Sequence, residues 1–343
     1  MGITPKNKVW SNICGTDLIR DDKGKFFVLE DNLRVPSGVA YMLENRNIMK
    51  RVIPDLFNSY AVNPIDDYPS QLFKCLGEAS FNTNANKKIV VLTPGVFNSA
   101  YFEHSYLAQQ MGVELVEASD LYVSRSNNVL MKTINGPKKI DVIYRRIDDV
   151  FIDPKVWRKD SSLGIPGIYN AWKNKKIAIV NAPGSGVADD KAVYAFVPKM
   201  IKFFLKEEPI ISQVKTYVCA FKKDLNYVTN NIEKLVLKPV NESGGYGILI
   251  GPQSSKSELK KYKSKILNNP RNFVAQPLIK LSTSPTLINK KIMPRHLDLR
   301  PFILSGKNSF VTQGGLTRVA MKKGSTIVNS SQGGGSKDTW IAD

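Results

Sequence analysis

Short apolar runs alternate with segments of helical spacing in the middle of the chain. The runs KIVVLTPG at 88–95, DVIYRRIDD at 141–149 and KKIAIVNAPG at 175–184 are apolar without polar alternation, which is typical of strands buried on both faces. FEHSYLAQQMG at 102–112 has helical spacing. Strands that alternate with helices in this way predict an α/β layer with parallel pairing. We assign this layer to residues 87–190.

The N-terminal segment predicts a β-hairpin followed by a helix. Strand-like segments at Thr16–Arg20 and Phe26–Glu30 flank the turn sequence DDKG. Helical spacing follows at 39–49. Short helical patterns and three prolines then indicate a connector over 51–86, which separates residues 1–50 from the layer at 87–190 along the chain.

The last part of the chain changes pattern once more. Asp189-Asp190-Lys191 has the polar start of a helix, and its apolar positions extend to Phe204. Further elements are expected as strand, glycine-rich loop and strand over 235–251, a helix over 255–268, and the strand FVAQPLI over 273–279. Residues 297–340 alternate strands with turns. We therefore expect a small lobe at 191–285 and a further strand-rich part at 286–343.

Composition adds size and charge to this picture. The chain has 343 residues, of which 42% are hydrophobic, and this is enough for two or three domains. Its net charge of +19 favours anionic partners such as nucleotides, nucleic acid or a membrane surface. The densest basic run holds a single aromatic residue, whereas nucleic-acid grooves interleave arginines with several aromatics. We interpret it as a solvated helix face; it comprises Lys256, Lys260, Lys261, Lys263 and Lys265.

Cysteine content and apolar runs indicate a compartment. Cys14, Cys75 and Cys219 are far apart and odd in number, which predicts neither a disulfide framework nor a metal knuckle. The start of the chain lacks the apolar run of a signal peptide, and no stretch is long and apolar enough to span a bilayer. A cytoplasmic protein without membrane contact is the expectation.

A lysine followed by a glycine-rich loop is the first candidate for chemistry. Lys238 lies near the end of an expected strand, and ESGGYG at 242–247 follows. Glycines allow backbone N–H groups to approach phosphate oxygens, and lysine adds a positive charge. The spacing is neither that of a Walker A loop nor that of the dinucleotide fingerprint. A plain hairpin with a glycine turn explains these residues equally well.

The hairpin at the N-terminus holds a candidate metal site. Glu30 and Asn32 project from the same face of one strand, and the turn folds Asp17 opposite them. Two carboxylates and an amide oxygen suit Mg²⁺ bound to substrate phosphates. The alternative is a solvent-facing acidic hairpin. Arg34 nearby could balance charge beside the metal.

Two further segments carry candidate ligand contacts. His296, Asp298 and Arg300 alternate along an expected strand and share a face, so Arg300 could hold phosphate or carboxylate. The alternative is a surface strand with an Asp–Arg pair. The glycine clusters QGGLTR at 313–318 and VNSSQGGGS at 328–336 lie near apolar strands, which favours backbone close to a ligand over a flexible loop.

Two other polar positions allow a functional and a structural interpretation. His104 lies on an expected helix, where a satisfied structural histidine is favoured over a general base. Arg145 and Arg146 with Asp148 and Asp149 could bind a carboxylate substrate, but a salt-bridged strand end is the more cautious interpretation.

The order of these motifs resembles the ATP-grasp ligases. KP…ESGGYG, VAQPLI, DLRPFIL and TRVA…VNSSQGGG are similar to the phosphate lysine, glycine-rich flap, hinge strand, catalytic arginine and asparagine loop of that fold. In ordinary members the metal motif comes last, whereas here DLIRDDKGKFFVLEDNLRVPSG comes first. The chain therefore resembles the circularly permuted ATP-grasp family (type 2) related to glutathionylspermidine synthase, over nearly its whole length. This implies an α/β fold with a pre-ATP-grasp layer, in which residues 286–343 and 1–50 join as one catalytic lobe.

The resemblance implies roles for individual residues. Lys238 holds ATP phosphates, Lys191 is a second nucleotide lysine, and Gln276 lines the adenine hinge. Arg300 stabilises the transferring phosphoryl group, and Asn329 faces the phosphates or the acyl-phosphate. The remaining roles are the flap over the phosphates, formed by Gly244, Gly245 and Gly247, and the Mg²⁺ ligands, Asp17, Glu30 and Asn32.

The implied activity is ATP-dependent joining of a small-molecule carboxylate to an amine, with a separate helical protein as a further partner. The chain departs from the family pattern in that a further region precedes the Asp17 strand in other members. Three alternatives stay open: an inactive or truncated nucleotide-binding module, a phosphotransferase that uses the same ATP site, and a nucleic-acid binder recognised by tight, salt-sensitive binding to unrelated DNA.

Overall fold

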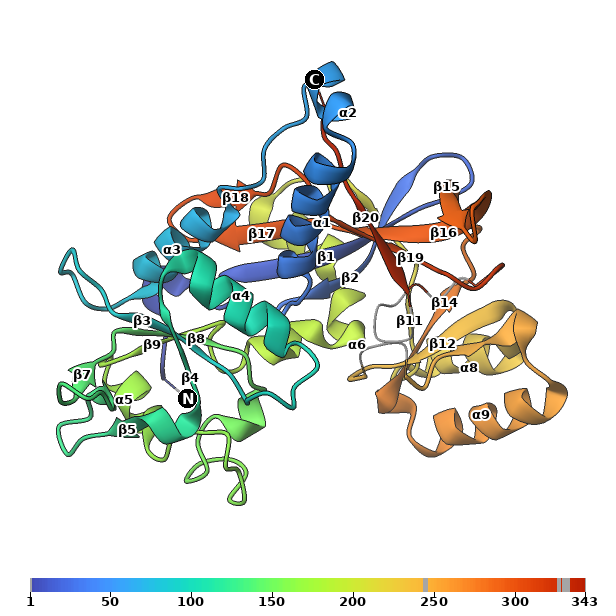
Figure 1. Ribbon diagram of the computed structural model, residues 1–343. Helices are drawn as coiled ribbons and strands as arrows, with labels where there is room; N and C mark the ends of the chain where they lie inside the picture. Colours follow the sequence, from blue (N-terminus) through green and yellow to red (C-terminus); the bar gives the residue numbers. More distant parts are fainter. Residues whose placement is uncertain (1, 243–245, 326–327, 329–333, 343) are drawn as a thin grey trace.

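The computed structural model describes residues 2–242, 246–325, 328 and 334–342, and it has a mixed α/β architecture. Three larger sheets organise it: a nine-stranded sheet, a parallel four-stranded sheet and a four-stranded antiparallel sheet in a smaller lobe. Figure 1 shows the smaller lobe, with α8 and α9, apart from the parallel sheet, and the nine-stranded sheet above both. The α/β prediction is therefore confirmed.

Strands from the two ends of the chain lie side by side in the nine-stranded sheet. Its main path runs β10-β2-β1-β16-β19-β20, β15 pairs with β16, and β17 pairs with β1 and β18. The bounds are β1 (Ile13–Arg20), β2 (Phe26–Asn32), β10 (Ser212–Gln213), β15 (Thr283–Ile288), β16 (Lys291–Arg300), β17 (Phe302–Ser305), β18 (Ser309–Val311), β19 (Leu316–Val319) and β20 (Gly335–Asp338).

The predicted N-terminal hairpin is present and sets the register of the site. β1 and β2 are antiparallel, with Asp17 opposite Glu30 and Gly15 opposite Asn32. A register shift after Asp17 places Leu18 opposite Val28. Directly opposite residues on neighbouring strands have side chains within contact distance. The hairpin therefore brings the side chains of Asp17 and Glu30 together on one face of the sheet.

The predicted parallel layer is also present. Its strand order is β4-β3-β8-β9 and every pair is parallel. Val91 faces one buried side and Val90 the other, as expected for a sheet covered on both faces. The strands are β3 (Ile89–Leu92), β4 (Glu114–Val116), β8 (Val142–Arg145) and β9 (Ala178–Val180), and a small sheet of β5 (Leu121–Val123), β6 (Val129–Met131) and β7 (Lys138–Lys139) lies beside them.

Three helices join the parallel sheet to the nine-stranded sheet. The main core contains buried residues of α1 (Val39–Val52), α3 (Tyr68–Ala79) and α4 (Tyr101–Met111) together with residues from β1, β3, β8 and β17. Phe302 of β17 contacts Tyr68 of α3, with ring centroids 6.2 Å apart. The two sheets therefore share one apolar core. The remaining helices of this part are α2 (Pro54–Ser59) and α5 (Ile168–Lys173).

The smaller lobe has its own core. Its sheet has the order β11-β14-β12-β13, and the predicted basic helix α9 packs on it through Tyr262 and Ile266. Ser255 and Glu258 form a capping box that starts α9. Its lysines are exposed, except for a half-buried Lys263, which confirms the solvated face. The bounds are β11 (Tyr217–Val218), β12 (Leu235–Pro239), β13 (Leu249–Ile250), β14 (Phe273–Pro277), α8 (Lys222–Asn230) and α9 (Lys256–Asn268).

The single helix predicted from Asp189 to Phe204 is wrong. The segment forms α6 (Lys191–Tyr194), α7 (Val197–Met200) and a π-helical turn at Ile201–Leu205. Asp190 caps α6 by accepting the N–H of Ala192 at 2.8 Å. Pro198 lacks an N–H and is tolerated only in a first helical turn, so it starts a new helix.

Across the described residues, no helix combines the length and apolar content needed to cross a membrane.

Candidate active site

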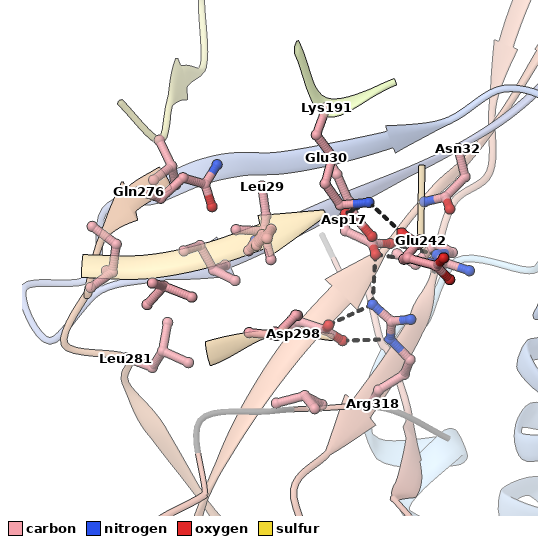
Figure 2. Close-up of a pocket in the computed structure, with 18 of the residues that line it drawn as sticks. Asp17, Leu29, Glu30, Asn32, Lys191, Glu242, Gln276, Leu281, Asp298 and Arg318 are labelled. Carbon is pink, nitrogen blue, oxygen red and sulfur yellow. Dashed lines mark hydrogen bonds and ion pairs between the residues drawn. The ribbon is translucent and has the colours of Figure 1, made fainter. Parts of the chain in front are cut away.

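A cavity of about 350 Å³ lies between the nine-stranded sheet and the smaller lobe. One end is apolar, with Leu29, Val236 and Leu281 among its lining residues. The other end collects charged side chains, which Figure 2 shows around Asp17 and Glu30. Its cationic residues are Lys191, Lys238, Arg300 and Arg318. An apolar end joined to a cationic end suits a ligand that has a flat apolar group and several negative charges.

Two arginines and two aspartates form the floor of the charged end. Arg300 contacts both carboxylate oxygens of Asp17 through Nε and Nη2, the latter at 2.8 Å. Arg318 donates to Asp17 Oδ2 at 2.7 Å and to both oxygens of Asp298, at 2.8 and 2.6 Å. Figure 2 shows Arg318 between the two aspartates. The floor is thus a buried, charge-balanced cluster drawn from β1, β16 and β19.

The cluster shifts the pKa values of its aspartates in opposite directions. Burial alone raises the pKa of Asp17, but Arg300 and Arg318 outweigh burial and lower it to about 2. Burial raises the pKa of Asp298 to about 6; Arg318 opposes this, and the negative charge of Asp17 adds to it. Asp17 is therefore the anion that both arginines share.

Glu30 and Asn32 lie beside this floor, and Lys191 reaches Glu30 from α6. The Lys191 ammonium is 3.4 Å from Glu30 Oε2 and donates to the carbonyl of Glu242 at 2.8 Å. The Asn32 amide nitrogen donates to the carbonyl of Gly15 at 3.1 Å. Glu30 and Asn32 both line the cavity. Lys191 therefore connects the nine-stranded sheet to the start of the glycine-rich segment.

Lys238 enters the charged end from β12. It is buried, and the described residues supply no hydrogen-bond or ion-pair partner for its ammonium. Burial lowers the pKa of Lys238, Glu30 opposes this shift, and Lys191 adds to it. A buried cation without a partner is costly unless an anion comes to it. Lys238 is thus available for an anionic ligand.

Gln276 marks the apolar end of the cavity. It lies on β14, and its amide nitrogen donates to Thr216 Oγ1 at 2.9 Å. Gly247 has a positive φ of 70°, and its carbonyl accepts the phenol of Tyr262 at 2.6 Å. Gly244, Gly245 and Asn329, three of the predicted site residues, lie outside the described residues.

The predicted site residues that the structure describes thus fall around one cavity, except Gly247, which is not among its lining residues. Arg34 is not among the residues that line this cavity, but it lines a smaller neighbouring cavity with Glu30 and Asn32. It pairs with Asp189 at 3.2 Å and Asp148 at 3.5 Å. His104 is buried against Thr93 Oγ1 at 2.9 Å, which confirms the structural interpretation of this histidine.

The cautious interpretation of the two neighbouring arginines is also confirmed. Arg145 pairs with Asp149 at 2.6 Å and donates to backbone carbonyls, and Arg146 pairs with Glu103 at 2.9 Å. Both guanidinium groups are buried and fully engaged by the protein, apart from the Nε of Arg146, which has no partner among the described residues. Neither arginine is among the residues that line the cavity between the nine-stranded sheet and the smaller lobe.

Sequence reasoning missed the parts that Arg318 and Asp298 play in the floor of the cavity. Both residues belong to motifs described above. Their contact comes from the pairing of β16 with β19, which places Asp298 opposite Arg318. The sequence does contain a basic position, Arg318 in TRVA between two glycine clusters, and an acidic position, Asp298 in DLR, that could form an ion pair. Sequence spacing alone gives no register between the two strands.

The fold and the cavity define an ATP-grasp protein: a small antiparallel lobe and a large sheet enclose a cavity that is apolar at one end and cationic at the other. The chain belongs to the family described as circularly permuted ATP-grasp type 2, whose model matches residues 1–320. The family and its ligase-named relatives support an ATP-dependent ligase, and proteins of this fold generally use ATP and Mg²⁺.

Several proteins resemble this chain. An uncharacterized protein of Synechocystis sp. is 54% identical over 99% of this chain, and one of Mycobacterium bovis is 52% identical over 99%. A Frankia casuarinae protein named "Putative glutamate--cysteine ligase 2-2" is 42% identical over 96%. A solved glutathione synthetase-like effector of Globodera pallida has a TM-score of 0.61 at 12% identity, covering 97% of this chain and 77% of its own; it supports the fold alone.

The chain spans only part of these relatives. It covers 71% of the Synechocystis protein, 62% of the Mycobacterium bovis protein and 38% of the Frankia protein. The activities of the longer proteins are therefore a matter for proposal.

Proposed function

We propose that this protein joins a small-molecule carboxylate to an amine, at the expense of ATP and through an acyl-phosphate. One observation supports this most. Four cationic side chains and two side chains with oxygen donors, Glu30 and Asn32, lie together at one end of a cavity whose other end is apolar. The name of the Frankia relative, a ligase of glutamate and cysteine, makes amino acids the first substrates to test.

The cavity fits ATP by its chemistry. Adenine would occupy the apolar end near Gln276 and Leu281, and the phosphates would extend toward Lys238 and Lys191. A cavity of about 350 Å³ lies within the range of small-molecule sites. The ammonium of Lys238, for which the described residues supply no hydrogen-bond partner, would gain a counter-ion in such a complex.

The residues fit Mg²⁺ through Glu30 and Asn32. Mg²⁺ in phosphate sites is commonly held by one or two protein oxygens, together with waters and substrate phosphates. Both oxygens of Asp17 are already engaged by Arg300 and Arg318, so in this arrangement Asp17 would act through the arginines. Bound Mg²⁺ would neutralise charge on the phosphates.

The side chains of the site can support two chemical steps. First, a carboxylate oxygen of the acid attacks the γ-phosphorus and ADP leaves, while Arg300 faces the charge on the transferring group. Preorganised positive charge is the main catalytic contribution in phosphoryl transfer. Second, the amine attacks the acyl carbon, releases phosphate and loses a proton. Arg318 lies next to Arg300 and holds Asp17 and Asp298 in place while the charge changes.

A hydroxylamine trap tests this proposal without knowledge of the natural amine. Pools of amino acids and other small acids are incubated with Mg·ATP and hydroxylamine, and hydroxamate and ADP are measured. The ligase produces hydroxamate only when acid and ATP are both present, and Lys238→Ala loses it. Lys260→Ala, an exposed lysine of α9, is the matched control and keeps parental activity.

The other outcomes identify the alternative functions. A stable phosphorylated acid that hydroxylamine does not trap indicates a phosphotransferase. Absence of ADP with every acid, in a protein that binds Mg·ATP, indicates a nucleotide-binding module without ligase activity.

A further inference from the structure

A buried ion pair of the parallel layer lies directly behind the loop that leads from β2 to α1. Arg146 follows β8 and Glu103 lies on α4, and their side chains are 2.9 Å apart with almost no exposure. Neither residue lines the cavity. Their contacts nevertheless converge on one short segment, residues 36–38, which borders the cavity through Ser37.

Several polar groups of this turn are held by these two side chains. Arg146 donates from Nη1 to the carbonyl of Pro36 at 2.7 Å and from Nη2 to Ser37 Oγ at 2.7 Å. Glu103 Oε2 accepts the N–H groups of Gly38 at 2.6 Å and Ala40 at 3.2 Å. The pair therefore fixes both ends of the turn, and Glu103 accepts the N–H of the cap residue Gly38 and one free N–H of the first turn of α1, that of Ala40.

The same turn holds Arg300. The Ser37 carbonyl accepts from Arg300 Nη1 at 2.9 Å, while Nε and Nη2 of Arg300 point to Asp17. A planar guanidinium with contacts on two sides has a fixed orientation. Displacement of the Ser37 carbonyl would release one of these two sides.

We propose that Arg146 and Glu103 are positioning residues for Arg300, acting through the Ser37 carbonyl; this rests on the proposed function of Arg300 at the γ-phosphate. The parallel layer then does more than support the fold, because two of its side chains set the direction of a guanidinium in the ATP cavity. Such supporting contacts commonly decide whether a reactive group is held within a fraction of an ångström.

Arg146→Lys is the sharpest test, because it keeps the charge that faces Glu103 and removes the fork that reaches Pro36, Ser37 and Tyr144 together. Arg46→Lys is the matched control. Arg46 is equally buried, pairs with Asp338 at 2.7 Å and donates to two backbone carbonyls, but it touches no residue of the cavity.

Calorimetry compares Mg·ATP with Mg·ADP, which lacks the γ-phosphate. We expect Arg146→Lys to weaken Mg·ATP binding about tenfold and Mg·ADP binding less than threefold, while Arg46→Lys changes neither; tenfold is within the usual coupling between contacting residues. In a protein that already carries Arg300→Lys, Arg146→Lys should weaken Mg·ATP binding less than a further twofold. Equal losses for both nucleotides, or an undiminished effect in that background, would overturn the positioning role.

Two further arms keep the test decisive. If Arg146→Lys does not fold, Ser37→Ala removes only the Oγ contact, and it should lower the preference for ATP over ADP about twofold to threefold, a share of the same coupling. If the parent binds no nucleotide, the proposed function fails by itself. Positioning is then judged from urea unfolding, in which Arg146→Lys and Arg300→Lys should be non-additive and Arg46→Lys and Arg300→Lys additive. Additivity in both pairs would overturn it.

Discussion

Asp17→Asn removes the one negative charge that Arg300 and Arg318 share. The substituted amide keeps the shape of the carboxylate but directs an NH₂ group toward guanidinium donors. The Asp17 side chain is buried and accepts three hydrogen bonds, so both arginines lose a charged partner. The variant is therefore expected to be folded but distinctly less stable.

The size of the loss follows from two estimates. Lowering the pKa of Asp17 from 3.8 to about 2 corresponds to about 2 kcal/mol of stability at pH 7. Breaking a buried ion pair by removal of one partner costs roughly 3–5 kcal/mol. Because the arginines keep some access to the cavity and its water, we expect a loss of about 3 kcal/mol.

The loss also depends on pH in a defined direction. Since the folded-state pKa of Asp17 lies below the unfolded value, its contribution is present above pH 4 and disappears as the pH falls toward 2. The part of the difference that comes from this pKa shift should fall to about half by pH 3, so the total difference between parent and Asp17→Asn should fall from about 3 to about 2 kcal/mol.

Urea unfolding of both proteins between pH 7 and pH 3 measures these differences. Asp66→Asn is the control, because Asp66 forms an exposed pair with Lys50, and its loss should cost no more than about 1 kcal/mol. A difference below about 1 kcal/mol for Asp17→Asn at pH 7, or one that does not change with pH, would refute the shared-anion account.

Three further perturbations test other parts of the structure. Gly38→Ala should destabilise by about 2–4 kcal/mol in thermal or urea unfolding, because φ is +120° and the new Cβ would lie 2.8 Å from Leu316 Cδ2; Gly136→Ala, with φ +90° and open space, should cost only about 1 kcal/mol. His104→Gln should make the free energy of unfolding less dependent on pH. Burial lowers the pKa of His104 to about 3, so the free energy of unfolding of the parent falls by about 2 kcal/mol from pH 7 to pH 5, and that of the variant should fall less in urea unfolding. Lys191→Ala should weaken Mg·ATP binding about tenfold by calorimetry, since it removes a cation at the phosphate end, and an unchanged affinity would exclude that role.

The sequence predicted the parts of the fold that depend on local pattern. The hairpin of β1 and β2 followed from strand-like segments on either side of a turn, and the opposition of Asp17 and Glu30 followed from the hairpin itself. The parallel layer followed from apolar runs between helices. The helix from Asp189 onward failed because Pro198 starts a second helix and Phe196 lies between the two pieces.

The arrangement of the candidate site depends on contacts that local pattern does not encode. Asp17 and Arg318 are 301 positions apart in sequence, and only the pairing of β16 with β1 and β19 brings them together. The link from Arg146 through Ser37 to Arg300 likewise joins segments that are far apart in sequence. The residue types predict charged side chains at these positions, but the register between strands far apart in sequence determines which of them form ion pairs.

The proposed function requires that ATP binds in the cavity between the large sheet and the smaller lobe, with its phosphates at Lys238. Calorimetric titration of the parent, Lys238→Ala and Lys260→Ala with ATP, with and without Mg²⁺, tests it most directly. We expect micromolar to sub-millimolar binding that requires Mg²⁺, is lost or at least about tenfold weaker in Lys238→Ala, and is unchanged in Lys260→Ala. A folded parent that binds no ATP, or a Lys238→Ala variant that binds it as tightly as the parent, would contradict the account.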